Sequence, residues 1–188
     1  MIDATLLLLA GGASRRMGQP KALLPVAGTT LLEWMADRLG GDFEELLVSA
    51  RDPALVPFRL RDRTVLDDFA GGGPLAGIAA GLAAARHDRV VAVACDMPRV
   101  TPDLLRRLAE EVASADVAIP RVNGRSEPVC ACYRKSAEPS IRDSLKAGRL
   151  RASGVLGRLS VRWVDDLDPN LFWSLNTPED YQHFRSAV

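Results

Sequence analysis

A glycine-rich loop with three basic side chains follows the first apolar run of the sequence. It begins after Leu9 and carries Arg15, Arg16 and Lys21 within seven residues. Its glycine pair, Gly11-Gly12, lets the backbone turn tightly and approach a ligand, because no Cβ stands in the way. Successive backbone amides in such a loop form a concave anion-binding site. The residue types therefore predict a cradle for the phosphates of a ligand.

This first loop differs from both common glycine-rich signatures for nucleotides. It has no Gly-Lys-[Ser/Thr] ending, and the spacing Gly-x-Gly-x-x-Gly does not fit it. A P-loop kinase and a nicotinamide-dependent dehydrogenase are therefore disfavoured.

A single carboxylate, Asp96, follows another apolar run, Val90–Cys95. Mg²⁺ is usually held by one or two carboxylates together with phosphate oxygens. Asp96 is not needed as a helix cap, because Thr101 supplies one for the next helix. The structural alternative is a turn made with Pro98. We predict that Asp96 binds Mg²⁺ close to the phosphates.

A second glycine-rich loop, Asp67–Gly77, follows a short run at 63–66 and leads into a helix of small residues. Small residues allow close packing of the helix on a sheet, which is the structural explanation for Gly77 and Gly81.

The pattern of apolar residues shows which elements position these loops. Buried parallel strands are expected at Ala4–Leu9, Leu46–Ala50 and Val90–Cys95. Helices are expected at 31–39, at 75–86 and after the cap at Thr101. Alternating strands and helices predict an α/β protein with helices on both faces of the sheet. Ligands bind such sheets beyond the carboxyl ends of the strands, where the three loops would meet.

The second half of the sequence is less regular. Short strands are expected at 116–119, 128–133 and 160–164, and helices at 136–147, 152–159 and 178–185. The last helix has Thr177 as N-cap and Pro178 at its first position. The chain has no internal repeat or linker, so we expect one domain over residues 1–188.

The formal net charge of the 188 residues is zero. The field of the whole molecule therefore gives no reason to expect nucleic acid or an anionic membrane as partner. An anionic ligand has to be held by a local site.

The cysteines and the apolar start favour a cytoplasmic protein. The cysteines are three, an odd number, without Cys-x-x-Cys spacing, which is typical of a reducing compartment. Cys130 and Cys132 would share one strand face as small core residues. The apolar run at 6–10 is too short to span a bilayer, and Asp3 stands where a signal peptide has positive charge.

The first loop resembles the opening signature of the small nucleotidylyltransferases. It reads Leu9-Ala10-Gly11-Gly12-x-Ser14-Arg15-Arg16-Met17-Gly18-x-x-Lys21, and this form with Gly-Gly and Arg-Arg is similar to the molybdenum cofactor guanylyltransferases, the molybdopterin-guanine dinucleotide biosynthesis protein A family. The resemblance extends from Leu6 to Phe184. It implies a three-layer α/β/α, Rossmann-like nucleotidyltransferase fold with a mostly parallel sheet.

The resemblance also implies roles for individual residues. The implied nucleotide contacts are Leu9, Ala10, Gly11, Gly12, Lys21, Asp68 and Asp96. Asp96 would also bind Mg²⁺, whereas Asp67 is expected to be solvated. Asn176 and Arg125 are the implied contacts of the acceptor, although Ser174 stands where the family often has a second asparagine.

The implied reaction is attack by the phosphate of molybdopterin on the α-phosphorus of GTP, with release of pyrophosphate. The nucleophile is already anionic, so no histidine base is needed, and His87 and His183 are expected at the surface. Catalysis would consist of positioning and charge neutralisation by Mg²⁺, Arg15 and Lys21.

Two other functions stay open from the sequence. The first is cytidylyl transfer to the same cofactor or to another small phosphorylated acceptor, since Gln19-Pro20-Lys21 is closer to the cytidylyltransferases. The second is a nucleotide-binding regulatory module without turnover, which is disfavoured because both Lys21 and Asp96 are present. The oxidation-prone acceptor predicts transient contacts with other molybdenum-cofactor biosynthesis proteins.

Overall fold

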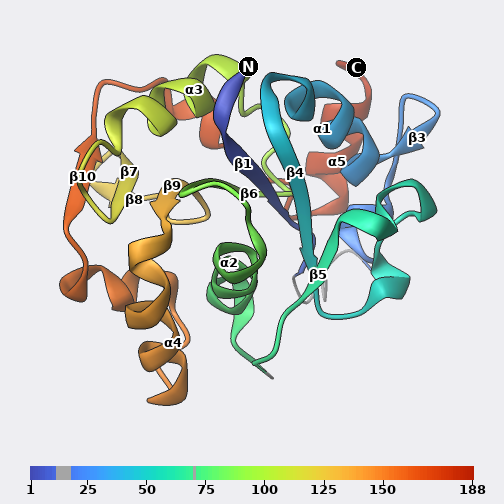
Figure 1. Ribbon diagram of the computed structural model, residues 1–188. Coiled ribbons are helices and arrows are strands. Elements are labelled where there is room, and N and C mark those ends of the chain that lie inside the picture. Colours follow the sequence, from blue (N-terminus) through green and yellow to red (C-terminus); the bar gives the residue numbers. More distant parts are fainter. Residues whose placement is uncertain (12–17, 70) are drawn as a thin grey trace.

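The computed structural model describes residues 1–11, 18–69 and 71–188, and one mixed sheet runs through them (Figure 1). Its strands lie in the order β10-β7-β9-β6-β1-β4-β5, and β8 pairs with β7 outside this path. The bounds are β1 Ile2–Leu9, β4 Phe43–Ala50, β5 Thr64–Leu66, β6 Arg89–Ala94, β7 Val117–Val122, β8 Arg125–Ser126, β9 Cys130–Arg134 and β10 Val161–Val164. Along the path only β9 runs antiparallel to its neighbours among the described residues. The expected mostly parallel sheet is confirmed.

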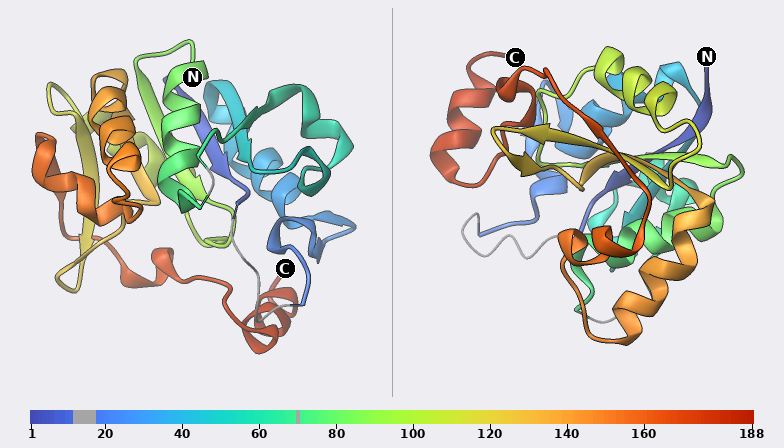
Figure 2. Two further views of the ribbon diagram at one scale, coloured as in Figure 1. Left: turned by 90° about the horizontal axis from the view of Figure 1, so that it is seen from below. Right: turned by 90° about the vertical axis from the view of Figure 1, so that its left-hand side faces the viewer.

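Helices cover both faces of this sheet (Figure 2). They are α1 Leu31–Leu39, α2 Gly73–Ala84, α3 Pro102–Glu111, α4 Glu138–Lys146 and α5 Pro178–Arg185. One core cluster joins the sheet to α1, α3 and α5, and the other joins it to α2 and α4. The three-layer α/β/α architecture is confirmed. No helix of the described residues is long and apolar enough to cross a membrane.

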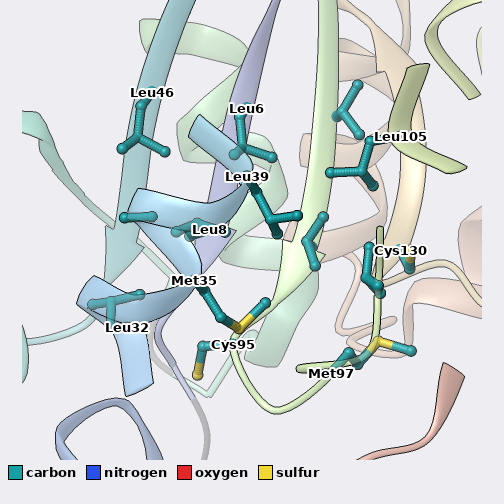
Figure 3. Packing of buried hydrophobic residues seen from close by; sticks show 14 of the residues in the cluster. Leu6, Leu8, Leu32, Met35, Leu39, Leu46, Cys95, Met97, Leu105 and Cys130 are labelled. Atoms are coloured by element: carbon teal, nitrogen blue, oxygen red, sulfur yellow. The ribbon is translucent and has the colours of Figure 1, made fainter. Parts of the chain in front are cut away.

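The strand β1 is apolar without interruption from Leu6 to Leu9, where it lies between the two cores. Leu6 and Leu8 point into the cluster with α1, where Figure 3 shows them beside Leu39 and Met35. Leu7 points into the opposite cluster. A strand covered on both faces needs this continuous apolar run rather than an alternating pattern.

The cysteines are small core residues, as expected. Cys95, Cys130 and Cys132 are free and buried in the same cluster. Burial raises the pKa of the Cys95 thiol to about 12. Such thiols stay protonated at neutral pH and are poor nucleophiles.

Local side-chain hydrogen bonds fix the starts of three helices. Thr30 and Thr177 each form a complete capping box at the start of α1 and α5. The Thr101 hydroxyl accepts the Leu104 N–H at 3.4 Å at the start of α3. The caps predicted from the sequence are confirmed.

Two glycines let α2 lie close to the sheet. A Cβ added at Gly77 would lie 2.4 Å from Ser49 Oγ, and one added at Gly81 would lie 2.2 Å from Leu7 Cδ2. Neither distance is allowed for a real Cβ, so the structural explanation of these glycines holds.

Some elements differ from the expectation. The segment predicted as a helix at 152–159 is a 3₁₀ helix, Ala152–Arg158, in which Gly154 and Gly157 disfavour the α-form. A hairpin of two short strands, β2 Pro25–Val26 and β3 Thr29–Thr30, was not predicted. It is too short to show an apolar pattern, and it turns at 27–28, where both residues have positive φ.

Candidate active site

An open cleft of about 620 Å³ lies at the carboxyl ends of β1 and β6. Its walls are formed by residues 9–11, 18–21 and 94–96, together with Leu55, Pro74 and Val129. This is the edge of the sheet at which the sequence places the glycine-rich loops. The predicted nucleotide contacts Leu9, Ala10 and Gly11 lie in the wall of this cleft.

Backbone hydrogen bonds beyond the strand ends hold the segments around the cleft together. The Ala10 N–H donates to the Ser49 carbonyl at 2.8 Å, and the Cys95 N–H donates to the Leu9 carbonyl at 3.1 Å. The Leu175 N–H donates to the Asp96 carbonyl at 2.8 Å. The last bond brings the segment before α5 next to the end of β6.

Three predicted site residues meet at the cleft. Lys21 Nζ lies 2.8 Å from Asp96 Oδ2 and 3.2 Å from Asn176 Oδ1. The side chains of Lys21 and Asp96 are 16 % and 27 % exposed. The three residues come from separate parts of the chain, 75 and 155 positions apart. Only the tertiary fold brings them together.

The cap of α5 determines where Asn176 lies. The backbone N–H groups of Asn176 and Thr177 both donate to Asp180 Oδ2, at 2.9 and 2.8 Å. These bonds hold the pKa of the Asp180 carboxyl below its ordinary value. The capping box thus also fixes the backbone whose side chain reaches Lys21.

The donor atoms at this point fit a divalent cation. Asp96 and Asn176 offer carboxylate and amide oxygens, which are the ligand types that hard divalent cations prefer. The ammonium group of Lys21 already lies against both oxygens, so the structure accommodates a cation there.

The loop before α2 carries two acids, Asp67 and Asp68, which differ in exposure. Asp68 is 68 % exposed and lies 3.9 Å from Arg142. It is not among the described residues that line the cleft, and its role at the nucleotide stays a prediction. Asp67, expected to be solvated, is half-buried, and burial raises the pKa of its carboxyl. That expectation was wrong.

The structure leaves three predicted residues without a test. Gly12 and Arg15 lie outside the described residues. Arg125 is exposed on β8 and is not among the described residues around the cleft. Its contact with the acceptor stays a prediction.

The two histidines, both expected at the surface, differ in exposure. His183 is exposed, but the His87 side chain is only 17 % exposed. Its Nδ1 lies 2.9 Å from Asp3, and its Nε2 lies 3.9 Å from Glu44. The three residues have the geometry of a metal-binding group, but Arg89 also pairs with Asp3, at 3.1 Å. This group lies where β1, β4 and β6 begin, at the edge opposite the cleft.

Sequence reasoning missed part of the cleft wall. Leu55 lies in the 3₁₀ helix Pro53–Leu55, and Val129 precedes β9, where its carbonyl accepts the Ala94 N–H at 2.9 Å. Apolar side chains in such short segments have no chemical signature in the sequence, and no other signal points to them.

The fold and this edge of the sheet define the class of the protein, a nucleotidyltransferase. A largely covered lysine and a carboxylate face each other at the strand ends, where such enzymes handle phosphates. The chain belongs to the family of the MobA-like NTP transferase domain, whose profile matches residues 6–162.

Relatives from two bacteria cover nearly the whole chain. The chain is 40 % identical over 189 residues to a molybdenum cofactor guanylyltransferase of Cereibacter sphaeroides, with 97 % of this chain and 95 % of the relative covered. It is 37 % identical over 189 residues to a probable molybdenum cofactor guanylyltransferase of Pelotomaculum thermopropionicum, with coverages of 96 % and 91 %. The resemblance seen in the sequence is confirmed.

A solved structure agrees with this assignment. The molybdopterin-guanine dinucleotide biosynthesis protein A of Archaeoglobus fulgidus superimposes with a TM-score of 0.82 at 27 % identity. The match covers 97 % of both chains.

Proposed function

We propose that the protein transfers the guanylyl group of GTP to the phosphate of molybdopterin, releasing pyrophosphate and forming the guanine dinucleotide cofactor. One observation carries this proposal: Lys21 and Asp96 meet at a cleft on the carboxyl edge of the sheet, in a chain of this family. The names of the relatives supply the nucleotide and the acceptor.

The cleft suits a nucleotide in size and character. Ligand pockets usually measure about 300–1,000 Å³ and combine apolar walls with a few polar groups. Leu55, Pro74 and Val129 provide apolar wall, and Lys21 provides positive charge. The backbone at 9–11 supports the proposed contacts with the nucleotide.

The reaction needs little covalent chemistry from the protein. A phosphate oxygen of the acceptor forms a bond to the α-phosphorus, and the bond from this phosphorus to the bridging oxygen breaks, so that pyrophosphate leaves. The acceptor oxygen is already anionic, so no side chain has to remove a proton from it. Positioning and charge neutralisation remain as the tasks of the site.

Lys21 would neutralise charge on the phosphates in the transition state. Asp96 would hold Mg²⁺, with the amide oxygen of Asn176 close to it. Bound Mg²⁺ would act as a Lewis acid and polarise a phosphoryl oxygen. Arg15 remains the proposed second cation.

Cytidylyl transfer is the second candidate. It is supported by Gln19 and Pro20, which precede Lys21 as in the cytidylyltransferases and lie in the wall of the cleft.

The proposal also includes the domain organisation, the protein partners and the location of the protein. The continuous sheet supports a single domain over residues 1–188. An oxidation-prone acceptor favours transient contacts with other molybdenum-cofactor biosynthesis proteins in the cytoplasm.

Thermal unfolding with Mg²⁺ and GTP, CTP, ATP or UTP tests the choice of nucleotide. A ligand at 100 times its Kd adds about 2.7 kcal/mol of stability. Stabilisation by GTP alone, followed by pyrophosphate release when molybdopterin is added, supports guanylyl transfer. Selective stabilisation by CTP moves the assignment to cytidylyl transfer, and no stabilisation by any nucleotide contradicts both.

A further inference from the structure

We propose that Lys21 is a placeholder cation: without nucleotide, its ammonium group occupies the place of the divalent metal between Asp96 and Asn176. A nucleotide then draws the ammonium to its phosphates and opens Asp96 to the metal. The inference rests on the proposed function in one respect, that Asp96 is the metal ligand.

The first step of the argument is the contact itself. The ammonium lies 2.8 Å from the Asp96 carboxylate and 3.2 Å from the Asn176 amide oxygen. A lysine ammonium has three N–H donors and no acceptor, so both contacts are donated by Lys21. The oxygens that suit a metal ion already bind a positive charge.

The second step is competition between cations. Mg²⁺ binds oxygen at about 2.0–2.1 Å and loses its water reluctantly. Bound to Asp96 Oδ2, it would lie against the ammonium that holds the same oxygen. Because the side chains of Lys21 and Asp96 are largely covered, water screens this repulsion poorly. Metal binding alone therefore includes the cost of displacing Lys21.

The third step is the effect of the nucleotide. Its phosphates offer a second set of anionic oxygens, and Lys21 lies in the wall of the same cleft. Once the ammonium binds phosphate, Asp96 and Asn176 are left for the metal. Bound nucleotide then raises the affinity for the metal, and bound metal raises the affinity for the nucleotide by the same factor, because coupling between two binding sites is reciprocal. The site thus takes up metal together with nucleotide and does not collect free metal.

Titration with Mn²⁺ alone, followed by electron paramagnetic resonance, tests this inference without nucleotide. Lys21→Met has a side chain of similar length without charge, and Lys21→Arg keeps the charge. We expect Lys21→Met to bind Mn²⁺ more tightly than wild type by about 5- to 150-fold, the usual range of coupling between sites. Lys21→Arg should bind like wild type.

Asp96→Asn, made in wild type and in Lys21→Met, locates the bound Mn²⁺. The tightened binding of Lys21→Met should disappear with Asp96→Asn. Binding that remains belongs to other groups, such as Asp3, Glu44 and His87. If Lys21→Met does not fold by circular dichroism, Lys21→Gln replaces it.

Three results would overturn the placeholder role. They are equal Mn²⁺ affinity in wild type and Lys21→Met, an equal gain in Lys21→Arg, and a gain that survives Asp96→Asn. The outcome is independent of the choice between GTP and CTP, because the titration contains neither. Failure of the nucleotide-binding test would remove the proposed function and leave the Mn²⁺ result standing.

Discussion

Charged side chains lie at both edges of the central sheet, where the strands begin and where they end. The charged side chains at one edge are arranged differently from those at the other. Where β1, β4 and β6 begin, Asp3 pairs with His87 and Arg89, and Glu45 pairs with Arg86. Each of these pairs joins an exposed side chain to a more covered one. We call them the amino-edge network.

The carboxyl edge has a cleft. There the pair of Lys21 and Asp96 lies beside a cleft with mostly apolar walls. A concave apolar site with a few convergent polar groups is typical of ligand binding. The comparison teaches that a cleft beside an ion pair, and not ion pairs alone, marks the functional edge of this sheet.

Asp96→Asn should have the largest effect. We expect kcat to fall by about 10²–10³-fold, as when other preorganised charge-stabilising groups are removed, because the variant loses the charge that holds the metal. Measured pyrophosphate release tests this, and the denaturation midpoint shows whether the fold is retained.

His87→Ala is the matched change in the amino-edge network. It removes a largely covered group with two carboxylate neighbours but should keep wild-type kcat and KM. If it lost activity as strongly as Asp96→Asn, the distinction between the two edges would be wrong.

Glu45→Ala should have the largest effect on stability at the amino edge. Glu45 is 11 % exposed and accepts hydrogen bonds from the Thr5 hydroxyl at 2.6 Å and from the Arg86 backbone N–H at 2.8 Å. The change leaves the buried Thr5 hydroxyl without this acceptor. We expect a loss of about 1.5–3 kcal/mol, the usual contribution of hydrogen bonds to charged groups.

Urea denaturation measures that loss, and Glu44→Ala is the control on the same strand. Glu44 is exposed, so its removal should change the free energy of unfolding by less than about 0.5 kcal/mol. Equal losses in the two variants would contradict the assigned role of Glu45.

The contrast between the edges also shows what the sequence could predict. The apolar runs predicted β1, β4 and β6, because the part of a strand that lies between two helical layers must be apolar on both faces. The caps at Thr30, Thr101 and Thr177 were predictable because their hydrogen bonds span only three residues. Both signals are local.

Long-range contacts had no such signal. Asn176 and Lys21 are in contact although they lie 155 positions apart. From the sequence, Lys21 was predicted to bind phosphate and Asn176 to bind the acceptor, and no contact between them was predicted. Glu45 and Thr5 meet because β4 pairs with β1 in a particular register. Asp67 was misassigned because its burial depends on packing around the end of β5, which the composition of the loop does not reveal.

Acid pH should weaken the amino-edge network. Burial alone would raise the pKa of Glu45, but hydrogen bonds from Thr5 and Arg86 hold it below its ordinary value of 4.5. The unfolded chain then binds protons more readily than the folded one, so stability rises with pH in this range. The stabilisation is complete above the ordinary pKa and is lost as the pH falls through the lowered pKa of the folded state.

Urea denaturation at neutral pH and at several values below 4.5 tests this dependence. Wild type should lose stability more steeply than Glu45→Gln, which cannot titrate at this position. Parallel curves for the two proteins would show that another carboxylate causes the acid sensitivity.

Asp3→Asn should have the smallest effect. Asp3 is 71 % exposed, and its pairs with His87 and Arg89 form at the surface, where salt screens ion pairs and their contribution is small. We expect a loss smaller than that of Glu45→Ala at low ionic strength, which disappears in about 1 M NaCl, where charges act over only about 3 Å. Unfolding free energies at both salt concentrations measure it, and catalytic activity should be unchanged. A loss of unfolding free energy that persists in high salt would mean that Asp3 is more than a partner in a surface ion pair. A loss of catalytic activity would mean that the amino edge contributes to the reaction.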